Sequence, residues 1–564
     1  MMKFIKLRVA SYFLIILFNN GITSFGQSLP IQNQSDTNIP HLRKQGTATQ
    51  LIVDGKPFLL LAGELGNNTA TNLEYMSRIW LKIIDTKLNS FLAAVSWAQV
   101  EPVEGKFDFT VLDSVIMGAR KNNLHMVILW FGSWKNGSST YAPEWVKRNF
   151  ERFPRVQNSD GRSLEILTPF SNANRDADAR AFASLMWHIK HVDGLQHTIV
   201  MIQVENEIFG RDRSALAAKA YNKQVPCALI DYLKKHKDLL IPELLAVWET
   251  SGCKTSGTWE EVFGKSTAAD EIFMAWHFSG YIGRIAEMGK AEYPLPMFIN
   301  SWGWAFPKEG QNTNGAPMSD VFDIWRAGAP QIDMICPDIY DSDYAKSCSL
   351  YIRSGNPLFI PETRGFPPNN LATRVLYAFG RHDAIGFSPM GIERPEKPDA
   401  DLVSAYEVIA QLAPIISAHQ GDGTMTAVLI GANQEPQKVK VGDYTLEFSY
   451  IMPRVQPPTP QPQPPFPNAA AIIIQTGPEE FYAAGTGVNV KFTPNLPGPP
   501  YVGLATVEEG VFVNGKWIPG RVLAGDDTGD NSLLLPRLCE DLDRPALFGP
   551  SQKGIQHVRV YRYR

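Results

Sequence analysis

Eight short runs of apolar residues recur along positions 58–393, and each run ends in polar or aromatic side chains. A run that is apolar throughout predicts a strand buried on both faces, as in a parallel sheet covered by helices. Segments with helical spacing lie between the runs, for example at 107–122, 175–192 and 273–289. Eight alternations of strand and helix predict closure into a (β/α)₈ barrel. The predicted strands are 58–66, 89–97, 125–134, 198–207, 296–302, 332–340, 357–363 and 384–393.

One further apolar run, at 244–250, lies in the long segment between the fourth and fifth predicted strands. Counting it as a strand would give nine strands, which does not suit an eight-stranded barrel. We therefore assign it to an insertion over the face of the barrel at which the strands end. The opposite assignment, in which 244–250 is a barrel strand, stays open from the sequence alone.

The first 26 residues predict a secretory signal peptide. Basic residues begin the chain, an apolar stretch follows at 9–18, and Ser24-Phe25-Gly26 is a small-x-small cleavage site. The apolar stretch is too short to span a membrane. We therefore expect export to the periplasm or the medium of a bacterium, with no membrane span after cleavage.

The sequence changes character near residue 418. Helical spacing stops there, and short alternating segments with turn signals predict a β-sandwich over 419–564. A proline-rich stretch at 453–467 interrupts it as an exposed loop. The expected organisation is a signal peptide at 1–26, a barrel at 27–418 and this sandwich. Carbohydrate binding and bracing of the barrel are both open roles for the sandwich, and bracing is favoured because no aromatic platform stands out.

Charge and cysteine content exclude some classes of function. The formal net charge is −4 with acidic and basic residues interspersed, so no nucleic-acid partner is predicted. The cysteines are few and odd in number, and their spacing matches neither a disulfide framework nor a metal site. Cys336 is predicted to be a buried thiol, while a bridge in the pair Cys227–Cys253 or Cys336–Cys348 stays open. The five cysteines are Cys227, Cys253, Cys336, Cys348 and Cys539.

Two glutamates stand at the ends of predicted strands. Glu207 ends the fourth strand and Glu362 ends the seventh. The carboxyl ends of barrel strands form the face on which active sites lie. A pair of carboxyl groups there, one protonated and one ionised, suits the acid/base and the nucleophile of a retaining glycosidase. This chemistry requires no metal and no cofactor, and its partner is a carbohydrate substrate.

Other side chains near the strand ends are candidates for substrate binding. Glu64 lies at the end of the first strand and is a candidate to bind a sugar hydroxyl. Trp97 and Trp302 end the second and fifth strands, where an aromatic ring can stack on a sugar. Glu205 lies two residues before Glu207, so strand alternation would put both on one face. Glu205 either supports the site or forms a buried salt bridge.

The motifs around these residues resemble known families. Asn206-Glu207 after strand four, with a second glutamate after strand seven, resembles the clan of (β/α)₈ retaining glycosidases. Within this clan, the motifs resemble those of the β-galactosidases of glycoside hydrolase family 35, and some features are similar to family 42. It covers roughly residues 40–415, and the tail resembles a β-domain beside a bacterial subgroup of family 35. The motifs are Leu61-Ala-Gly-Glu-Leu-Gly66, Val95-Ser-Trp-Ala-Gln-Val-Glu-Pro102, Glu104-Gly-Lys-Phe-Asp-Phe109 and Gln203-Val-Glu-Asn-Glu207.

The resemblance implies a role for each matching residue. Glu207 would be the acid/base, and Glu362 would be the nucleophile. Asn206 would bind the 2-hydroxyl of the sugar, and Glu101 would hold galactose hydroxyls at the floor of the pocket. Tyr340 would donate a hydrogen bond to the nucleophile.

The sequence departs from the family 35 pattern in two places. Gln99-Val-Glu-Pro stands where family 35 usually has His-Glu-Pro, and Ile-Phe-Gly rather than Tyr-Gly follows Glu207. Pro-Glu-Thr-Arg-Gly around Glu362 is closer to family 42.

The expected function is that of an exported retaining exo-β-glycosidase, most specifically a β-galactosidase acting on plant-type oligosaccharides. The alternatives are an endo-acting glycanase on the same barrel and a non-catalytic carbohydrate-binding barrel. Long insertions at 132–175 and 208–295 favour walls around a pocket, and hence exo action. The presence of both glutamates favours catalysis.

Overall fold

The computed structural model describes most of the chain. The described residues are 39–301, 314–340, 343–364, 370–431, 433–451, 469–528, 532–535 and 554–564. The predicted signal peptide, Trp302, Cys539 and the proline-rich loop lie outside them.

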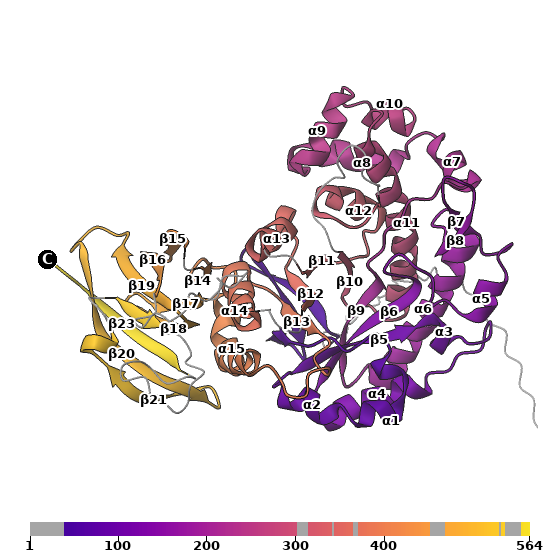
Figure 1. The fold of residues 1–564 in the computed structure, drawn as a ribbon. Helices are drawn as coiled ribbons and strands as arrows, with labels where there is room; N and C mark the ends of the chain where they lie inside the picture. Colours follow the sequence, from indigo (N-terminus) through magenta and orange to yellow (C-terminus); the bar gives the residue numbers. More distant parts are fainter. Residues whose placement is uncertain are drawn as a thin grey trace, which may run out of the picture. The chain divides into compact units, whose positions relative to one another are not determined.

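Eight parallel strands form one sheet, which confirms the predicted (β/α)₈ barrel (Figure 1). The two ends of the sheet, β4 (Leu60–Leu61) and β5 (Ser90–Ser96), meet through backbone hydrogen bonds. Asn89 N–H donates to the Leu61 carbonyl (3.0 Å), and Leu92 N–H donates to the Gly63 carbonyl (2.9 Å). The remaining strands are β6 (His125–Lys135), β9 (Ile199–Asn206), β10 (Met297–Ser301), β11 (Met334–Ile339), β12 (Phe359–Arg364) and β13 (Gly386–Met390).

Helices follow the barrel strands along the chain and cover the outside of the sheet. In α4 (Thr110–Lys121) the buried residues recur at helical spacing, from Leu112 to Ala119, and this apolar stripe packs on the strands. The three segments with predicted helical spacing form α4, α6 (Asn172–Asp193) and α11 (Thr267–Glu292). The other covering helices are α1 (Leu73–Ser77), α2 (Trp80–Asp85), α12 (Phe322–Gly328), α13 (Tyr344–Tyr351), α14 (Leu371–His382) and α15 (Ala400–His419).

A small antiparallel sheet precedes the barrel and contributes to its interior. It consists of β1 (His41–Gln45), β2 (Ala48–Val53) and β3 (Lys56–Phe58). Every residue of β2 is buried, and Leu51 and Val53 belong to the apolar cluster inside the barrel. The sequence predicted a single strand over 58–66, but β3 ends at Phe58 and the barrel strand is shorter.

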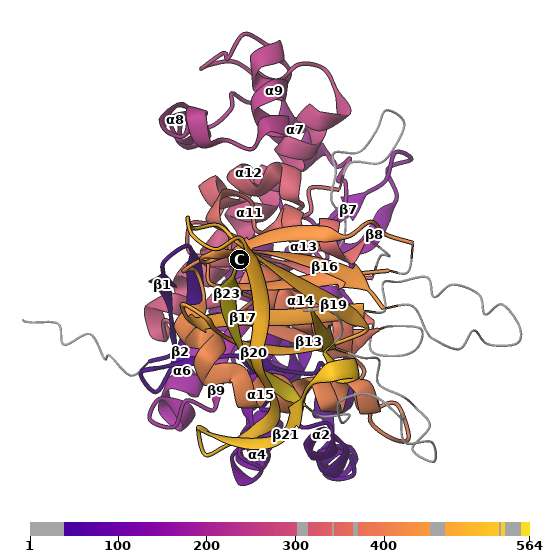
Figure 2. The ribbon, with the colours of Figure 1, turned by 90° about the vertical axis from the view of Figure 1, so that its left-hand side faces the viewer.

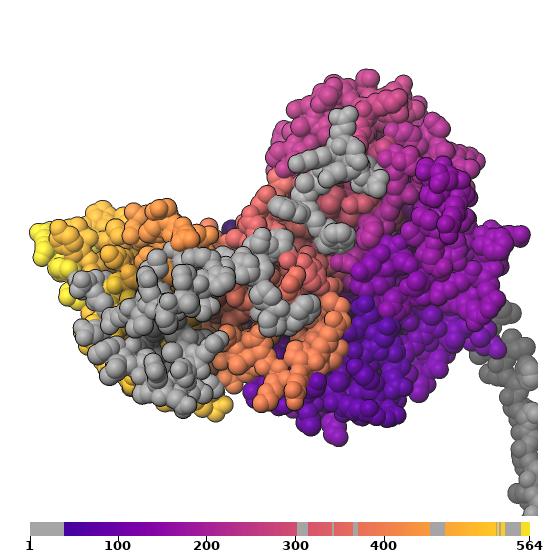
Figure 3. Space-filling view, viewed as in Figure 1, coloured from indigo at the N-terminus to yellow at the C-terminus, as the bar shows by residue number. Residues whose placement is uncertain are grey.

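The segment between β9 and β10 is a helical insertion. The run at 244–250 lies in α9 (Pro242–Thr250), so its assignment to an insertion rather than a barrel strand is confirmed. Proline at the first position of α9 suits a helix start, because it has no N–H to leave unpaired. The insertion forms a continuous magenta surface in Figure 3. Its other elements are α7 (Ala215–Tyr221), α8 (Cys227–Lys235), η2 (Lys237–Leu239) and α10 (Trp259–Phe263).

A second insertion follows β6, and shorter elements complete the barrel domain. The insertion contains α5 (Glu144–Arg148) and a hairpin of β7 (Arg155–Gln157) and β8 (Ser163–Leu167). The shorter elements are η1 (Thr69–Thr71), α3 (Trp97–Val100), η3 (Ser319–Val321) and η4 (Arg353–Gly355).

Two antiparallel sheets follow α15, in agreement with the predicted sandwich (Figure 2). Alternate residues of the larger sheet point to opposite sides. Val428 and Ile473 pack between the two sheets, whereas Ala427 and Ile472 join the barrel's apolar core. The larger sheet contains β14 (Met425–Ile430), β17 (Ala469–Gly477), β18 (Glu480–Thr486), β23 (Ile555–Tyr563), β20 (Tyr501–Val513) and β21 (Lys516–Leu523). The smaller sheet contains β15 (Gln437–Val441), β16 (Tyr444–Tyr450), β19 (Val488–Pro494) and β22 (Leu533–Leu535), and η5 (Gly525–Asp527) precedes β22.

The larger sheet packs directly on α14. A Cβ atom at Gly380 of α14 would lie 2.7 Å from side-chain atoms of Ala427 and Ile472, so only glycine allows this approach. The contact agrees with a bracing role for the sandwich.

One described helix, α15, is long and apolar enough to cross a membrane by length and composition. Its buried residues recur at helical spacing and form one face of the helix: Leu402, Ala405, Tyr406, Ile409, Leu412 and Ile416. The Tyr406 hydroxyl donates to the carbonyl oxygen of Ala62 in the barrel (2.7 Å). We therefore interpret α15 as a helix of the protein core.

No disulfide joins the four described cysteines to one another, and Cys336 is buried as predicted.

Candidate active site

Three carboxyl groups converge at the carboxyl ends of the barrel strands. Glu207 follows β9, Asp338 lies in β11, and Glu362 lies in β12. One carboxylate oxygen from each residue lies within 4.8 Å of the others. Asp338 and Glu362 are register partners on adjacent strands, which explains their proximity. All three are buried, with exposed fractions of 7%, 5% and 5%.

Local backbone geometry directs Glu207 into this cluster. Glu205 and Glu207 both have positive φ angles, 64° and 44°, at the end of β9. Such angles are costly for residues other than glycine and persist where surrounding contacts hold them. Asn300 of β10 supplies one such contact, because its Oδ1 accepts from the Glu207 N–H (2.9 Å). The same amide donates through Nδ2 to Asp338 Oδ2 (2.8 Å), which links Glu207 to Asp338.

Asn206 is fixed by a buried lysine. Lys135, the last residue of β6, donates from Nζ to Asn206 Oδ1 (2.6 Å). Asn206 is fully buried, and its Nδ2 has no hydrogen-bond partner among the described residues. A buried N–H without a partner is costly, so this one suits donation to a bound hydroxyl.

Burial and mutual repulsion keep protons in the cluster. Burial raises the pKa of Glu207, and the nearby charge of Glu362 raises it further, while Lys135 and Asp338 partly offset the effect. Burial, followed by the charge of Glu362, raises the pKa values of Asp338 and Glu64 well above their usual range. Carboxyl groups this close cannot all ionise near neutral pH. The cluster therefore offers a protonated acid beside an ionised carboxylate.

Tyr340 makes the contact with Glu362 that the resemblance implied. Its hydroxyl donates to Glu362 Oε1 and lies 3.4 Å from the sulfur of Met390. Burial and the charge of Glu362 raise the pKa of Tyr340, so the phenol remains a donor. Glu64 also lies here, buried after β4 and close enough to Glu362 for the two charges to interact.

Trp97 and Glu101 lie outside this cluster and contact each other. The ring of Trp97 is fully buried and packs edge-on against Trp145. Its Nε1 donates to Glu101 Oε2 (2.8 Å), and the Gly105 N–H donates to Glu101 Oε1 (2.7 Å). Both carboxylate oxygens of Glu101 thus stabilise the turn after α3. The structure gives neither residue a place at the acidic cluster, and Trp302 lies outside the described residues.

Glu205 does not share the acidic cluster either. It is fully buried, and it accepts from the backbone N–H groups of Ser133 (2.8 Å) and Trp134 (2.7 Å). Its pKa is raised by burial and then by Asp178, the carboxyl group beside it. The positive φ at Glu205 breaks strand alternation, so Glu205 and Glu207 face different surroundings. Glu205 supports the end of β6 instead.

The sequence analysis did not identify Asp338, Lys135 or Asn300 as residues of the site. A single aspartate inside the apolar run of β11, two residues before Tyr340, was the available signal for Asp338. Lys135 follows directly after the predicted third strand.

The oxygen atoms of Glu207, Asp338 and Glu362 are also close enough to hold a hard cation such as Ca²⁺.

Two regions of the chain match family models. Residues 72–269 match the family 42 glycoside hydrolase model, described as β-galactosidase. This match includes Glu207 but ends before Glu362. It indicates a glycoside hydrolase domain. Residues 402–533 match a second model, described as a domain of unknown function.

A curated relative carries the same description. A β-galactosidase of Xanthomonas manihotis is 28% identical over 195 residues, which are 33% of this chain and 29% of the relative. The match thus spans less than a third of the relative's length. The family-model match supports the resemblance to family 42 over residues 72–269, while membership of family 35 stays a prediction.

Solved β-galactosidase structures are similar at low identity. The enzyme from Bacillus circulans sp. alkalophilus has 17% identity and a TM-score of 0.45, covering 64% of this chain and 57% of that one. The enzyme from Halorubrum lacusprofundi has 16% identity and a TM-score of 0.42, covering 63% and 58%.

We predict that Asp338 tunes the pKa of Glu207. The interaction with Asp338 lowers that pKa, so Asp338→Ala should raise it. Glu207 must be protonated to act as an acid, so the alkaline limb of the kcat/KM profile should move to higher pH. The lost contacts should lower kcat about ten-fold. Asp338→Asn keeps a neutral hydrogen-bonding group and should stay near the wild-type profile; an unmoved limb in Asp338→Ala contradicts this role.

Proposed function

We propose that the chain is an exported retaining exo-β-glycosidase, most specifically a β-galactosidase that releases terminal galactose from plant-type oligosaccharides. The separation of the two glutamates carries the proposal. Retaining enzymes hold their carboxyl groups about 5–5.5 Å apart, and inverting enzymes about 6.5–9.5 Å apart. Carboxylate oxygens of Glu207 and Glu362 within 4.8 Å of each other favour the retaining geometry.

The reaction then has two displacements. In the first, a carboxylate oxygen of Glu362 attacks the anomeric carbon, and Glu207 donates its proton to the departing glycosidic oxygen. In the second, Glu207 takes a proton from water, and the water oxygen replaces Glu362 at the anomeric carbon. Asn206 would donate to the sugar's 2-hydroxyl, and its buried Nδ2, which has no hydrogen-bond partner among the described residues, supports this role.

Galactose and export rest on separate observations. The family 42 match and the printed description of the Xanthomonas relative support galactose as the released sugar. The order of basic, apolar and small residues in the first 26 positions supports export. Cleavage there predicts Gln27 as the first residue of the mature protein, which N-terminal sequencing of the secreted chain would check.

A panel of nitrophenyl glycosides tests the proposed function, with proton NMR of the first product. We expect the β-galactoside to be hydrolysed fastest and β-galactose to appear before its α anomer. Turnover should persist after dialysis against a chelator. Initial release of the α anomer contradicts the retaining mechanism. An inert β-galactoside beside an active different glycoside contradicts galactose specificity alone.

A further inference from the structure

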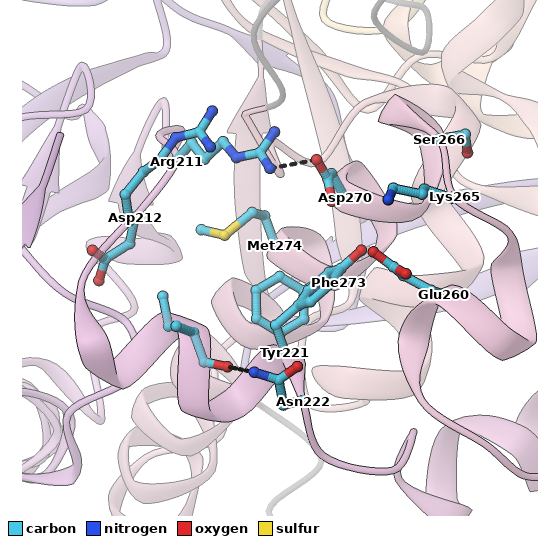
Figure 4. Close-up of a pocket in the computed structure, with 13 residues that line it drawn as sticks. Arg211, Asp212, Tyr221, Asn222, Glu260, Lys265, Ser266, Asp270, Phe273 and Met274 are labelled. Carbon is cyan, nitrogen blue, oxygen red and sulfur yellow. Dashed lines mark hydrogen bonds and ion pairs between the residues drawn. The ribbon is translucent and has the colours of Figure 1, made fainter. Parts of the chain in front are cut away.

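A cavity of about 530 Å³ lies in the insertion, separate from the acidic cluster (Figure 4). This volume falls within the usual range for small-molecule sites. Its lining residues come from the chain just after Glu207, from α7 and α10, and from the start of α11. The barrel sheet contributes none of them, so the cavity belongs to the insertion.

The side chains around the cavity are both apolar and polar. Tyr221 forms an aromatic wall, and its partly buried ring packs edge-on against the buried ring of Phe273, with centroids 5.0 Å apart. Arg211 and Asp270, which both line the cavity, form an ion pair that is drawn as a dashed line in Figure 4. The charged lining residues balance, with three basic and three acidic: Arg211, Arg213, Lys265, Asp212, Glu260 and Asp270.

This combination favours a neutral polyhydroxyl ligand. Balanced charge gives no preference for a strongly charged molecule. The ring of Tyr221 provides area for the apolar face of a sugar ring, and the ion pair provides both donors and acceptors for its hydroxyls.

The position of the cavity along the chain specifies the part of the substrate that it would take. Arg211 is four residues after Glu207, so the two Cα atoms lie at most about 14 Å apart. The acid/base protonates the leaving-group oxygen, so we assign a site next to Glu207 along the chain to the leaving-group side. We propose that the cavity is a subsite for a distal sugar residue on the leaving-group side of an oligosaccharide. This inference rests on the proposed function.

The test uses the full chain and β-(1→4)-linked galacto-oligosaccharides of two to five units. The readout is the kcat/KM of each oligosaccharide divided by that of nitrophenyl β-galactoside. For the longer oligosaccharides this ratio should fall about ten-fold in Tyr221→Ala, which removes the aromatic wall. Tyr221→Phe keeps the ring and should retain most of the ratio. Trp187→Ala removes a half-exposed ring that does not line the cavity and should leave the ratio unchanged.

Calorimetry separates failure of this subsite from failure of the proposed function. The pentamer is titrated into Glu362→Gln and into Glu362→Gln/Tyr221→Ala, so no turnover is needed. We expect about ten-fold weaker binding to the double variant. Equal binding by the two, or an unchanged ratio in Tyr221→Ala, overturns the subsite. A wild-type chain that hydrolyses no glycoside overturns the proposed function, whichever result the titration gives.

Discussion

A Glu362→Gln variant is expected to lose activity by a factor on the order of 10⁵ in kcat, or about 7 kcal/mol of transition-state stabilisation. Glutamine keeps the size of the side chain and can still accept the hydrogen bond from Tyr340. Its amide oxygen is too weak a nucleophile to form the glycosyl–enzyme bond. Since every substrate passes through this bond, the loss should not depend on the leaving group.

The measurement compares kcat for nitrophenyl and alkyl β-galactosides. Glu509→Gln provides a matched control, because Glu509 is another buried glutamate, 4% exposed, which accepts from Arg521 Nε at 2.9 Å in the sandwich. The kcat of this control should stay within about twofold of wild type, because a substitution in the sandwich leaves the transition-state contacts of the active site intact. Circular dichroism should show that both variants are folded. A folded Glu362→Gln protein with near wild-type kcat would rule out Glu362 as the nucleophile.

The same residue explains how Glu207 can change roles during one catalytic cycle. In the free enzyme the charge of Glu362 contributes to the raised pKa of Glu207. Formation of the ester with the sugar removes that charge, so the pKa of Glu207 falls. A lower pKa favours the ionised form, which accepts a proton from the attacking water. Close packing of the two carboxyl groups therefore supplies the acid for the first step and the base for the second.

The barrel could be predicted from the sequence because its strands are buried on both faces. Such strands must be apolar throughout, and their flanking helices must show helical spacing, so both signals are local. The three strands before the barrel escaped the prediction for a related reason. β2 is fully buried but packs into the interior from a short hairpin, and nothing in its composition separates it from a barrel strand.

The candidate site could be predicted only in part. Glu207 and Glu362 stand out because each carboxylate follows an apolar run. A single aspartate in an apolar run was too weak a signal to identify Asp338, whose place in the site follows from its register with Glu362 on the neighbouring strand. Trp97 and Glu101 stand just after a strand as well, but the sequence does not reveal which way a short helix turns them. In the structure Trp97 donates a hydrogen bond to Glu101, and Glu101 also accepts one from the backbone of the turn after α3.

A Glu207→Gln variant should show a loss that depends on the leaving group. General acid catalysis contributes about 10²–10⁴-fold, so alkyl and sugar leaving groups should slow by about 10³. A dinitrophenyl group departs without a proton, so formation of the glycosyl–enzyme should be nearly as fast as in wild type. Hydrolysis of that intermediate should then limit turnover, because glutamine cannot take a proton from water.

Two measurements follow from this asymmetry. Rapid mixing with the dinitrophenyl β-galactoside should show a burst of phenolate followed by a slow steady state. Azide needs no general base to attack the intermediate, so it should restore the steady-state rate and yield β-galactosyl azide, the product of two inversions. Asn206→Ala serves as the comparison, since it leaves Glu207 in place and should show neither burst nor rescue. An equal loss for alkyl and dinitrophenyl substrates, without rescue, would show that Glu207 is not the acid/base.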